Sequence, residues 1–460
     1  MMNNWNETLA TLAQAAPATP ANTVAAAAIA SVATAATAVT GTAGAIAFAV
    51  DSAVALVPPA GSAAAPATAP AGAAGASAAA TGTPAADSYA NFGAALTAAQ
   101  LADGFVAPIG NLGLIAATGA DAATFLHGQL TNDVANLPQG EVRLAGYCTP
   151  KGRLQATMQM WRGAASASAA PSASGTAAAS GPGAAVPAPV SASSADGTAA
   201  FGATTPDTIY LQLPLALQPA FQKRLSMFVM RAKARLVDAT RDPRFAVVLG
   251  FGGARAGAAL SQHVDTLPPA PNTARESANG MVLRLADAFG APRYLWLTSA
   301  GTALAALPGL RQTLTLGGTD AWELSGIHAG IAQVTAATLE QFVPQMINFE
   351  LVGGVNFKKG CYPGQEIVAR SQYLGKLKRR TTLATIADPA AAAGQELFSV
   401  DDPAQPCGMI VNAAPNGAGG VDALVEIKLA ALDQAVHLGS TTGAVVEFLP
   451  MPYALDALDL

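Results

Sequence analysis

One thiol in the C-terminal half of the sequence stands among residue types that favour its chemistry. Cys361 follows Lys358 and Lys359 in the segment Lys-Lys-Gly-Cys-Tyr-Pro-Gly-Gln-Glu. Thiols react as thiolates, and neighbouring cations favour the charged form. Gly360 and the pair Pro363-Gly364 permit tight turns around the cysteine. Because a cysteine in a core normally has apolar neighbours, this polar setting favours a reactive thiol over a buried structural one.

The segment around the cysteine also concentrates positive charge. Its formal charge is +6 between residues 358 and 380, whereas the whole chain carries −5. Two interpretations stay open: a charged face in contact with water, or a patch that binds a polycarboxylate tail, a phosphate or a nucleic-acid backbone. The bases concerned are Lys358, Lys359, Arg370, Lys376, Lys378, Arg379 and Arg380, with Glu366 as the only acid.

Hydrophobic patterns indicate which elements position this segment. Residues 365–370 fit either a short helix or a strand. Alternation over 154–161 predicts a strand with Gln155, Thr157 and Gln159 on one side. Further strands are expected over 112–117, 208–213, 231–237 and 293–298, helices over 122–130 and 217–228, and mainly Ala-rich helices over 254–317. Short β runs from 381 onward, separated by Gly, Pro and Asp, predict a small barrel.

Two tracts are nearly free of charge and rich in Ala, Thr, Pro and Gly. Residues 8–86 contain one charged residue, and residues 163–206 contain one. We expect both to be disordered, because such composition buries little apolar area. Residues 24–50 are uncharged, but their Ala, Thr and Gly insert poorly and no Lys or Arg flanks them, so we predict no membrane contact.

Cysteine usage points to a reducing compartment. Cys148, Cys361 and Cys407 are odd in number and far apart, and they match neither a zinc site nor a disulfide framework. We therefore predict a cytoplasmic protein without a metal site, with Cys148 and Cys407 structural. Residues 250–253, Gly-Phe-Gly-Gly, lack the full spacing of a nucleotide-binding loop and are interpreted as a plain turn.

The cysteine segment resembles the signature of the YgfZ-type folate-binding proteins. These are relatives of the glycine-cleavage-system T-protein, an aminomethyltransferase. Further segments are similar to the family in order, and the likeness spans about residues 105–455. They are Phe-Leu-His-Gly-Gln-Leu-Thr-Asn-Asp-Val at 125–134, Cys-Thr-Pro-Lys-Gly-Arg at 148–153, Phe-Val-Pro-Gln-Met-Ile-Asn at 342–348 and Leu-Pro-Met-Pro-Tyr at 449–453.

The resemblance implies an α+β fold: a three-part ring of two α+β parts and a C-terminal β-barrel around a folate pocket. It implies an extension over 1–98, α+β domains over 99–162 and 207–378, an insertion over 163–206 and a barrel over 379–455. The implied function is to assist assembly or repair of iron–sulfur proteins, linked to tRNA modification. The implied partners are tetrahydrofolate or a derivative, iron–sulfur client or assembly proteins, and tRNA.

The same resemblance assigns site residues. Cys361 is the implied functional thiol, and Trp322 matches a tryptophan that the family associates with folate. A second such position falls on Leu112, and His328 stands where the family often has a glutamate that faces the pterin. The remaining implied folate contacts come from the cysteine segment: Lys359, Tyr362, Gln365, Glu366 and Arg370.

One departure bears on activity. Aminomethyl transfer in the T-protein depends on an aspartate, and Gln155 stands at the matching place. A neutral amide cannot act as a carboxylate base, so we expect a protein that is not a conventional enzyme. Two alternatives stay open: a folate-dependent one-carbon transferase, and a tRNA-binding module that uses residues 358–380.

Overall fold

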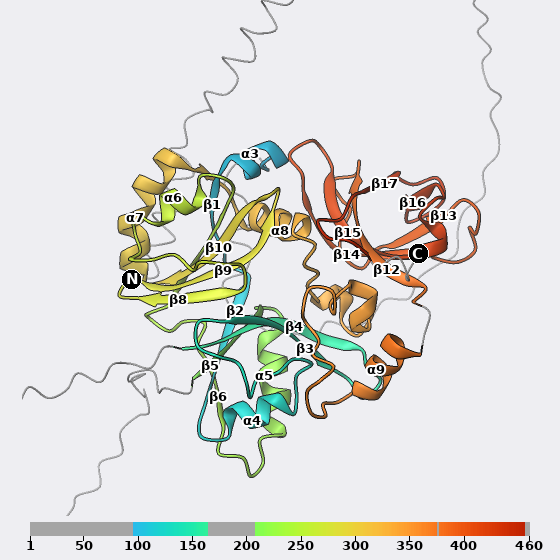
Figure 1. The fold of residues 1–460 in the computed structure, drawn as a ribbon. Helices are drawn as coiled ribbons and strands as arrows, with labels where there is room; N and C mark the ends of the chain where they lie inside the picture. The colour runs from blue at the N-terminus through green and yellow to red at the C-terminus, as the bar shows by residue number, and fades with distance from the viewer. Residues whose placement is uncertain (1–94, 164–207, 375–376, 456–460) are drawn as a thin grey trace, which may run out of the picture. The chain divides into compact units, whose positions relative to one another are not determined.

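The computed structural model describes residues 95–163, 208–374 and 377–455 (Figure 1). The fold in these ranges is α+β, with three β-sheets and short helices. Within them, no helix is both long and apolar enough to cross a membrane. Most of the predicted extension and insertion, and also Lys376, lie outside the described residues.

The first sheet has six strands, and four α-helices are associated with it. Only its edge pair β11–β1 is parallel; the other pairs are antiparallel. Its helices are α3 (Ala98–Asp103), α6 (Ala256–Leu260), α7 (Ala300–Thr313) and α8 (Thr319–His328). The strand order is β11 (Thr315–Leu316), β1 (Phe105–Pro108), β7 (Val247–Gly252), β10 (Ala291–Thr298), β9 (Gly280–Ala288) and β8 (Thr273–Ser277).

The second sheet has five antiparallel strands, and β4 and β5 flank residues 164–207. These two strands pair directly, with Gln159 opposite Gln212. The associated helices are α4 (Ala122–His127) and α5 (Gln218–Met227). The order is β3 (Val142–Cys148), β4 (Leu154–Arg162), β5 (Ile209–Pro214), β2 (Leu112–Thr118) and β6 (Arg235–Asp238).

The C-terminal strands form a nearly closed barrel, as predicted. A bridge between His437 and Val445 brings its two edge strands together. The chain that connects α8 to the barrel forms the 3-10 turns η3 (Ala336–Thr338) and η4 (Pro344–Ile347) and then helix α9 (Gln365–Tyr373). The barrel order is β16 (Val436–Leu438), β13 (Glu396–Ser399), β14 (Gly408–Pro415), β15 (Val421–Lys428), β12 (Arg379–Ile386) and β17 (Val446–Leu449), and η5 (Leu429–Ala431) follows β15.

The structure decides one open alternative and changes two local expectations. Residues 365–370 are helical, because Gly364 adopts a positive φ of 80° and starts α9. The strand predicted from 231 begins only at Arg235, since residues 228–234 form turns around Met230 at φ 38°. Residues 273–288 form the strands β8 and β9 where mainly helices were expected, because sheet pairing overrides the weak local pattern.

One glycine sets the approach of α8 to the first sheet. A Cβ at Gly250 would lie 2.5 Å from Trp322 Cε3, so a side chain on β7 would push the indole away. The Gly-Phe-Gly-Gly segment is thus the end of β7 followed by a turn at Gly253, as expected from its incomplete spacing. It contributes packing that positions Trp322.

Candidate functional site

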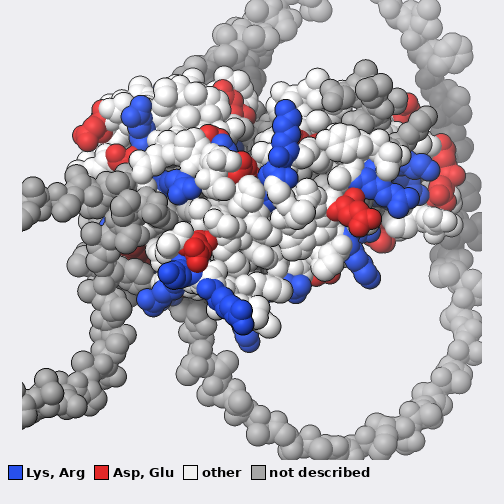
Figure 2. Space-filling model, turned by 60° about the horizontal axis from the view of Figure 1, so that its bottom comes forward, with Lys and Arg blue, Asp and Glu red and all other residues white. Residues whose placement is uncertain are grey.

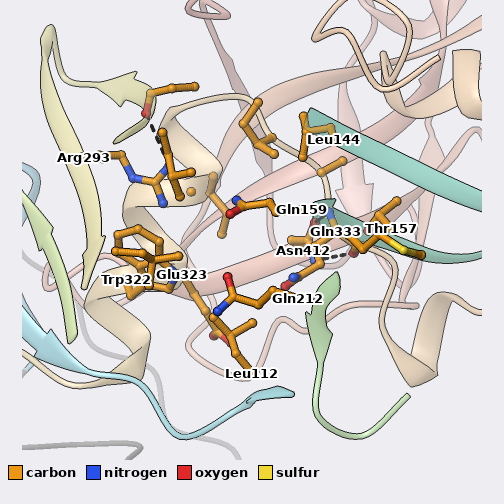
Figure 3. Close-up of a pocket in the computed structure, with 18 of the residues that line it drawn as sticks. Leu112, Leu144, Thr157, Gln159, Gln212, Arg293, Trp322, Glu323, Gln333 and Asn412 are labelled. Carbon is orange, nitrogen blue, oxygen red and sulfur yellow. Dashed lines mark hydrogen bonds between the residues drawn. The ribbon is translucent and has the colours of Figure 1, made fainter. Parts of the chain in front are cut away.

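A cavity of about 180 Å³ opens where residues of all three sheets and α8 meet (Figure 3). The first sheet contributes β9 and β10, the second contributes β2 to β5, and the barrel contributes β14. Its apolar walls come mainly from Leu112, Val142, Leu144, Met158, Leu285, Leu295, Ile327 and Ile331. Segments separated by up to three hundred residues therefore form one chamber.

An indole and a guanidinium form one wall of this cavity. The guanidinium carbon of Arg293 lies 4.2 Å from the centroid of the Trp322 ring. Its Nε donates to Ser325 Oγ at 2.9 Å, and Ser325 Oγ donates to the Trp322 carbonyl at 2.7 Å. Burial, and secondarily Arg284, lowers the pKa of Arg293 to about 9, so the side chain stays cationic at neutral pH. The cavity thus contains a fixed positive charge stacked on an aromatic face.

Glu323 adds a titratable carboxyl beside this wall. Asn111 Nδ2 donates to its Oε1 at 2.6 Å. The carboxyl is open to the cavity but surrounded by protein, and this loss of bulk water raises its pKa to about 7, although the bond from Asn111 opposes the shift. Near neutral pH, Glu323 can therefore either accept or donate a hydrogen bond.

Two glutamines extend into the cavity opposite Arg293, Trp322 and Glu323 (Figure 3). Gln159 Oε1 is buried without a hydrogen-bond partner among the described residues. Gln212, on the paired strand, is only 4% exposed. Because a buried amide oxygen normally finds a partner, Gln159 Oε1 is suited to accept a hydrogen bond from the polar edge of a ligand.

Other polar side chains of the cavity stabilise its wall instead. Thr157 Oγ1 accepts from the Val334 amide at 2.9 Å. Asn412 accepts from the Gln333 amide at 2.8 Å and donates to the Gln333 carbonyl at 2.9 Å. These bonds join β4 and β14 to the segment after α8.

Of the residues that the sequence assigned to folate, two line this cavity: Trp322 and Leu112. His328, the last residue of α8, is not in the lining. Its Nε2 lies 2.6 Å from Asp422 Oδ2 on β15, and its ring centroid lies 4.4 Å from that of Phe289. Burial opposes ionisation of Asp422, but bonds from His328 and Asn416 outweigh it and lower the pKa of Asp422. The structure therefore places His328 at the contact between α8 and the barrel.

The cysteine segment lies outside the cavity lining. Cys361 is exposed, whereas Tyr362 is buried and its ring centroid lies 4.7 Å from Lys359 Nζ. Burial lowers the pKa of Lys359 to about 8. Gln365, Glu366 and Arg370 lie on α9, the last two exposed. Burial also raises the pKa of the Tyr362 phenol well above its usual value.

The basic run is divided by ion pairs. Arg379 Nη1 lies 2.5 Å from Glu426 Oε2, and Arg380 pairs with the buried Glu350. Lys358, Arg370 and Lys378 are exposed. The face of the molecule in Figure 2 carries Lys and Arg in separate groups, with Asp and Glu among them. The described part of the run does not form one continuous cationic surface.

The described residues contain no group of three or more His, Cys, Asp or Glu side chains that could hold a metal ion. Cys148 and Cys407, expected to be structural, are both buried. Burial raises the pKa of the Cys148 thiol to about 12. Cys361 is thus the exposed thiol among the three.

No family model matches the chain. Among solved structures, it is similar to the glycine cleavage system aminomethyltransferase T from Bartonella henselae, with a TM-score of 0.56 and 14% identity. The match covers 77% of this chain and 86% of that chain. The likeness shows the fold, and it confirms the expected T-protein-like α+β architecture with a C-terminal barrel.

Proposed function

We propose that this protein binds tetrahydrofolate or a derivative, with the pterin in the cavity. The observation that carries the proposal is the wall of Trp322 and Arg293 facing the amides of Gln159 and Gln212, within a T-protein-like fold; Gln159 Oε1 has no partner among the described residues. A flat ring with donors and acceptors along its edges matches an aromatic face opposed by amides. Bound in this cavity, a reduced folate would supply a carrier for one-carbon groups.

The size and charge of the cavity indicate which part of a folate it takes. Pockets for drug-sized ligands usually measure ~300–1,000 Å³, whereas this cavity measures about 180 Å³. It therefore suits the ring system, and the glutamate tail would extend outside. Glu323 supplies an acceptor for ring N–H groups, and Arg293 supplies positive charge.

We further propose that the protein assists the assembly or repair of iron–sulfur proteins, in connection with tRNA modification. This role is supported by the resemblance of the cysteine segment and by the exposure of Cys361. An exposed thiol can reach a protein partner, whereas a thiol inside the cavity could not. A cytoplasmic location stays a prediction from the cysteine pattern.

The alternatives lack a specific observation in their favour. Gln155, which stands at the place of the transferase aspartate, is a neutral amide that donates to Glu340, and it is not in the cavity lining. The tRNA-binding alternative uses residues 358–380 as a phosphate patch, but within this run Arg379 and Arg380 are paired with Glu426 and Glu350.

Calorimetric titration with tetrahydrofolate tests the cavity. Wild type should bind saturably, and Trp322→Ala should bind about tenfold or more weakly, since ring stacking contributes ~1–3 kcal/mol per ring. Trp161→Phe is the matched control: it is buried, outside the lining, and its Nε1 has no partner among the described residues. Absence of binding by wild type, or equal affinity in Trp322→Ala, would contradict the proposal.

A further inference from the structure

A histidine lies beside the residue that precedes the exposed cysteine. His127 ends α4, and its Nδ1 lies 3.0 Å from Asp133 Oδ1. A Cβ at Gly360 would lie 3.6 Å from His127 Nε2, so the other ring nitrogen faces the residue that precedes Cys361. The described residues offer Nε2 no hydrogen bond. The Asp133 carboxylate, which only accepts, lies 3.0 Å from Nδ1, whereas the Ala135 amide reaches Nδ1 only at 3.4 Å. The shorter bond favours the neutral ring with the proton on Nδ1 and a lone pair on Nε2.

Asp133 is itself held in the ionised form. Burial opposes ionisation, but bonds from the backbone and side chain of Asn136, together with the charges of His127 and Arg143, outweigh it and lower the pKa of Asp133. Arg143 Nη1 also donates to the Asp133 carbonyl at 2.7 Å. A carboxylate so fixed determines the ring orientation of His127.

Hydrogen bonds hold the cysteine segment against α4. Lys359 Nζ donates to the carbonyls of His127 and Leu130, the latter at 2.8 Å. Thr131 Oγ1 donates to the Gly354 carbonyl at 2.6 Å. These bonds join the segment that precedes Cys361 to the end of α4 at two points, Gly354 and Lys359, and hold this segment beside the imidazole.

We propose that His127, oriented by Asp133, accepts the proton of the Cys361 thiol when that thiol reacts. The inference deepens the proposed function, because it rests on Cys361 being used as a reactive thiol. A nucleophile, an imidazole and a carboxylate in this order form the arrangement that activates thiols and hydroxyls. Asp133 is a positioning residue. Lys359 is a nearby cation that interacts electrostatically with both Asp133 and Cys361. The other ionisable groups nearby are Lys358, Arg143 and Tyr362.

Alkylation of the full-length protein with iodoacetamide tests this proposal. The sulfur forms a bond to carbon, iodide leaves with the electron pair of the C–I bond, and the thiol proton passes to His127 Nε2. Labelling is followed by peptide mass spectrometry at Cys361 between about pH 6 and 9, and buried Cys148 and Cys407 serve as internal references. Cys361→Ser confirms the site of labelling.

His127→Asn separates proton transfer from structure. Its amide can still donate to Asp133 where Nδ1 does, but it places no base near Gly360. We expect labelling about tenfold or more slower near pH 7, and a rate that rises with pH as for an ordinary thiol. Asp133→Asn should give a smaller slowing, and His437→Asn in the barrel none.

An unchanged rate and pH profile in His127→Asn would overturn the inference, because a purely structural His127–Asp133 bond predicts that result. If this variant does not fold by circular dichroism, His127→Gln and Asp133→Asn decide by the same criterion. Tetrahydrofolate affinity should stay within about twofold of wild type. The test can therefore fail while the proposed folate site stands, and the reverse also holds.

Discussion

The cavity and the cysteine segment use polar groups in opposite ways. In the cavity, Gln159 Oε1 is buried without a partner among the described residues, and Glu323 has a raised pKa. In the cysteine segment, Lys359 bonds to two carbonyls while Cys361 stays exposed. Unpartnered buried groups are costly unless a ligand satisfies them, whereas a hydrogen-bonded scaffold holds an exposed group in place. We infer that one region receives a small molecule and the other presents a thiol.

The largest expected effect comes from removing the thiol. Cys361→Ser should abolish the recovery of iron–sulfur enzyme activity in a deletion strain, because a hydroxyl lacks the nucleophilicity and metal affinity of a thiolate. Tetrahydrofolate affinity should stay within about twofold of wild type, since the residue is outside the cavity. Full recovery by this variant would remove Cys361 from the function, and a parallel loss of folate binding would mean that the two regions act as one site.

A smaller effect should follow from the charge of Glu323. Its pKa is about 7, so below that pH a ligand that donates N–H groups must displace a proton in order to bind. Affinity for tetrahydrofolate should therefore rise about tenfold from pH 6 to pH 8, as expected for one linked proton. Calorimetry should also show proton release on binding.

The matched variant for this pH effect is Glu323→Gln, which keeps the shape and removes the titration. Its affinity should be nearly constant over the same range. A pH slope that persists in this variant would assign the proton to another group, such as the ligand itself.

The smallest effect on ligand binding is expected at His328. His328→Asn should change tetrahydrofolate affinity less than about threefold, because the ring bonds Asp422 outside the lining. The free energy of unfolding in urea should fall by about 1–3 kcal/mol, since Asp422 Oδ2 loses its bond to the imidazole and the carboxylate keeps the support of Asn416 at Oδ1. Asp103→Asn, at an exposed pair with Arg255, is the control and should change stability by less than about 1 kcal/mol. A large loss of affinity with unchanged stability would support the pterin contact that the resemblance implied.

The strand over 154–161 shows how far local pattern reaches. Alternation predicted Gln155, Thr157 and Gln159 on one side, and two of these three line the cavity. Nothing in the pattern indicated Gln212 or Arg293. Gln212 comes to the cavity because β5 pairs with β4 across the intervening tract, and Arg293 because β10 brings it under α8.

The basic run shows what charge counting could not predict. Charge counting treated Lys359, Arg379 and Arg380 as equivalent members of an anion-binding patch. The fold uses Lys359 to satisfy carbonyls at the end of α4 and pairs the two arginines with Glu426 and Glu350. The formal charge of the run was counted correctly. Whether each cation is available to bind an anion depends on partners that are distant in sequence.

The sequence by itself determined most elements of secondary structure, the β-rich C-terminal part and the unusual setting of Cys361, because turn chemistry and apolar periodicity act over a few neighbouring residues. Tertiary structure decided which side chains share the cavity, which cations remain exposed and which imidazole lies beside the segment that precedes Cys361. These outcomes depend on contacts between segments far apart in the chain, and such contacts follow from sheet pairing and packing that no local pattern encodes.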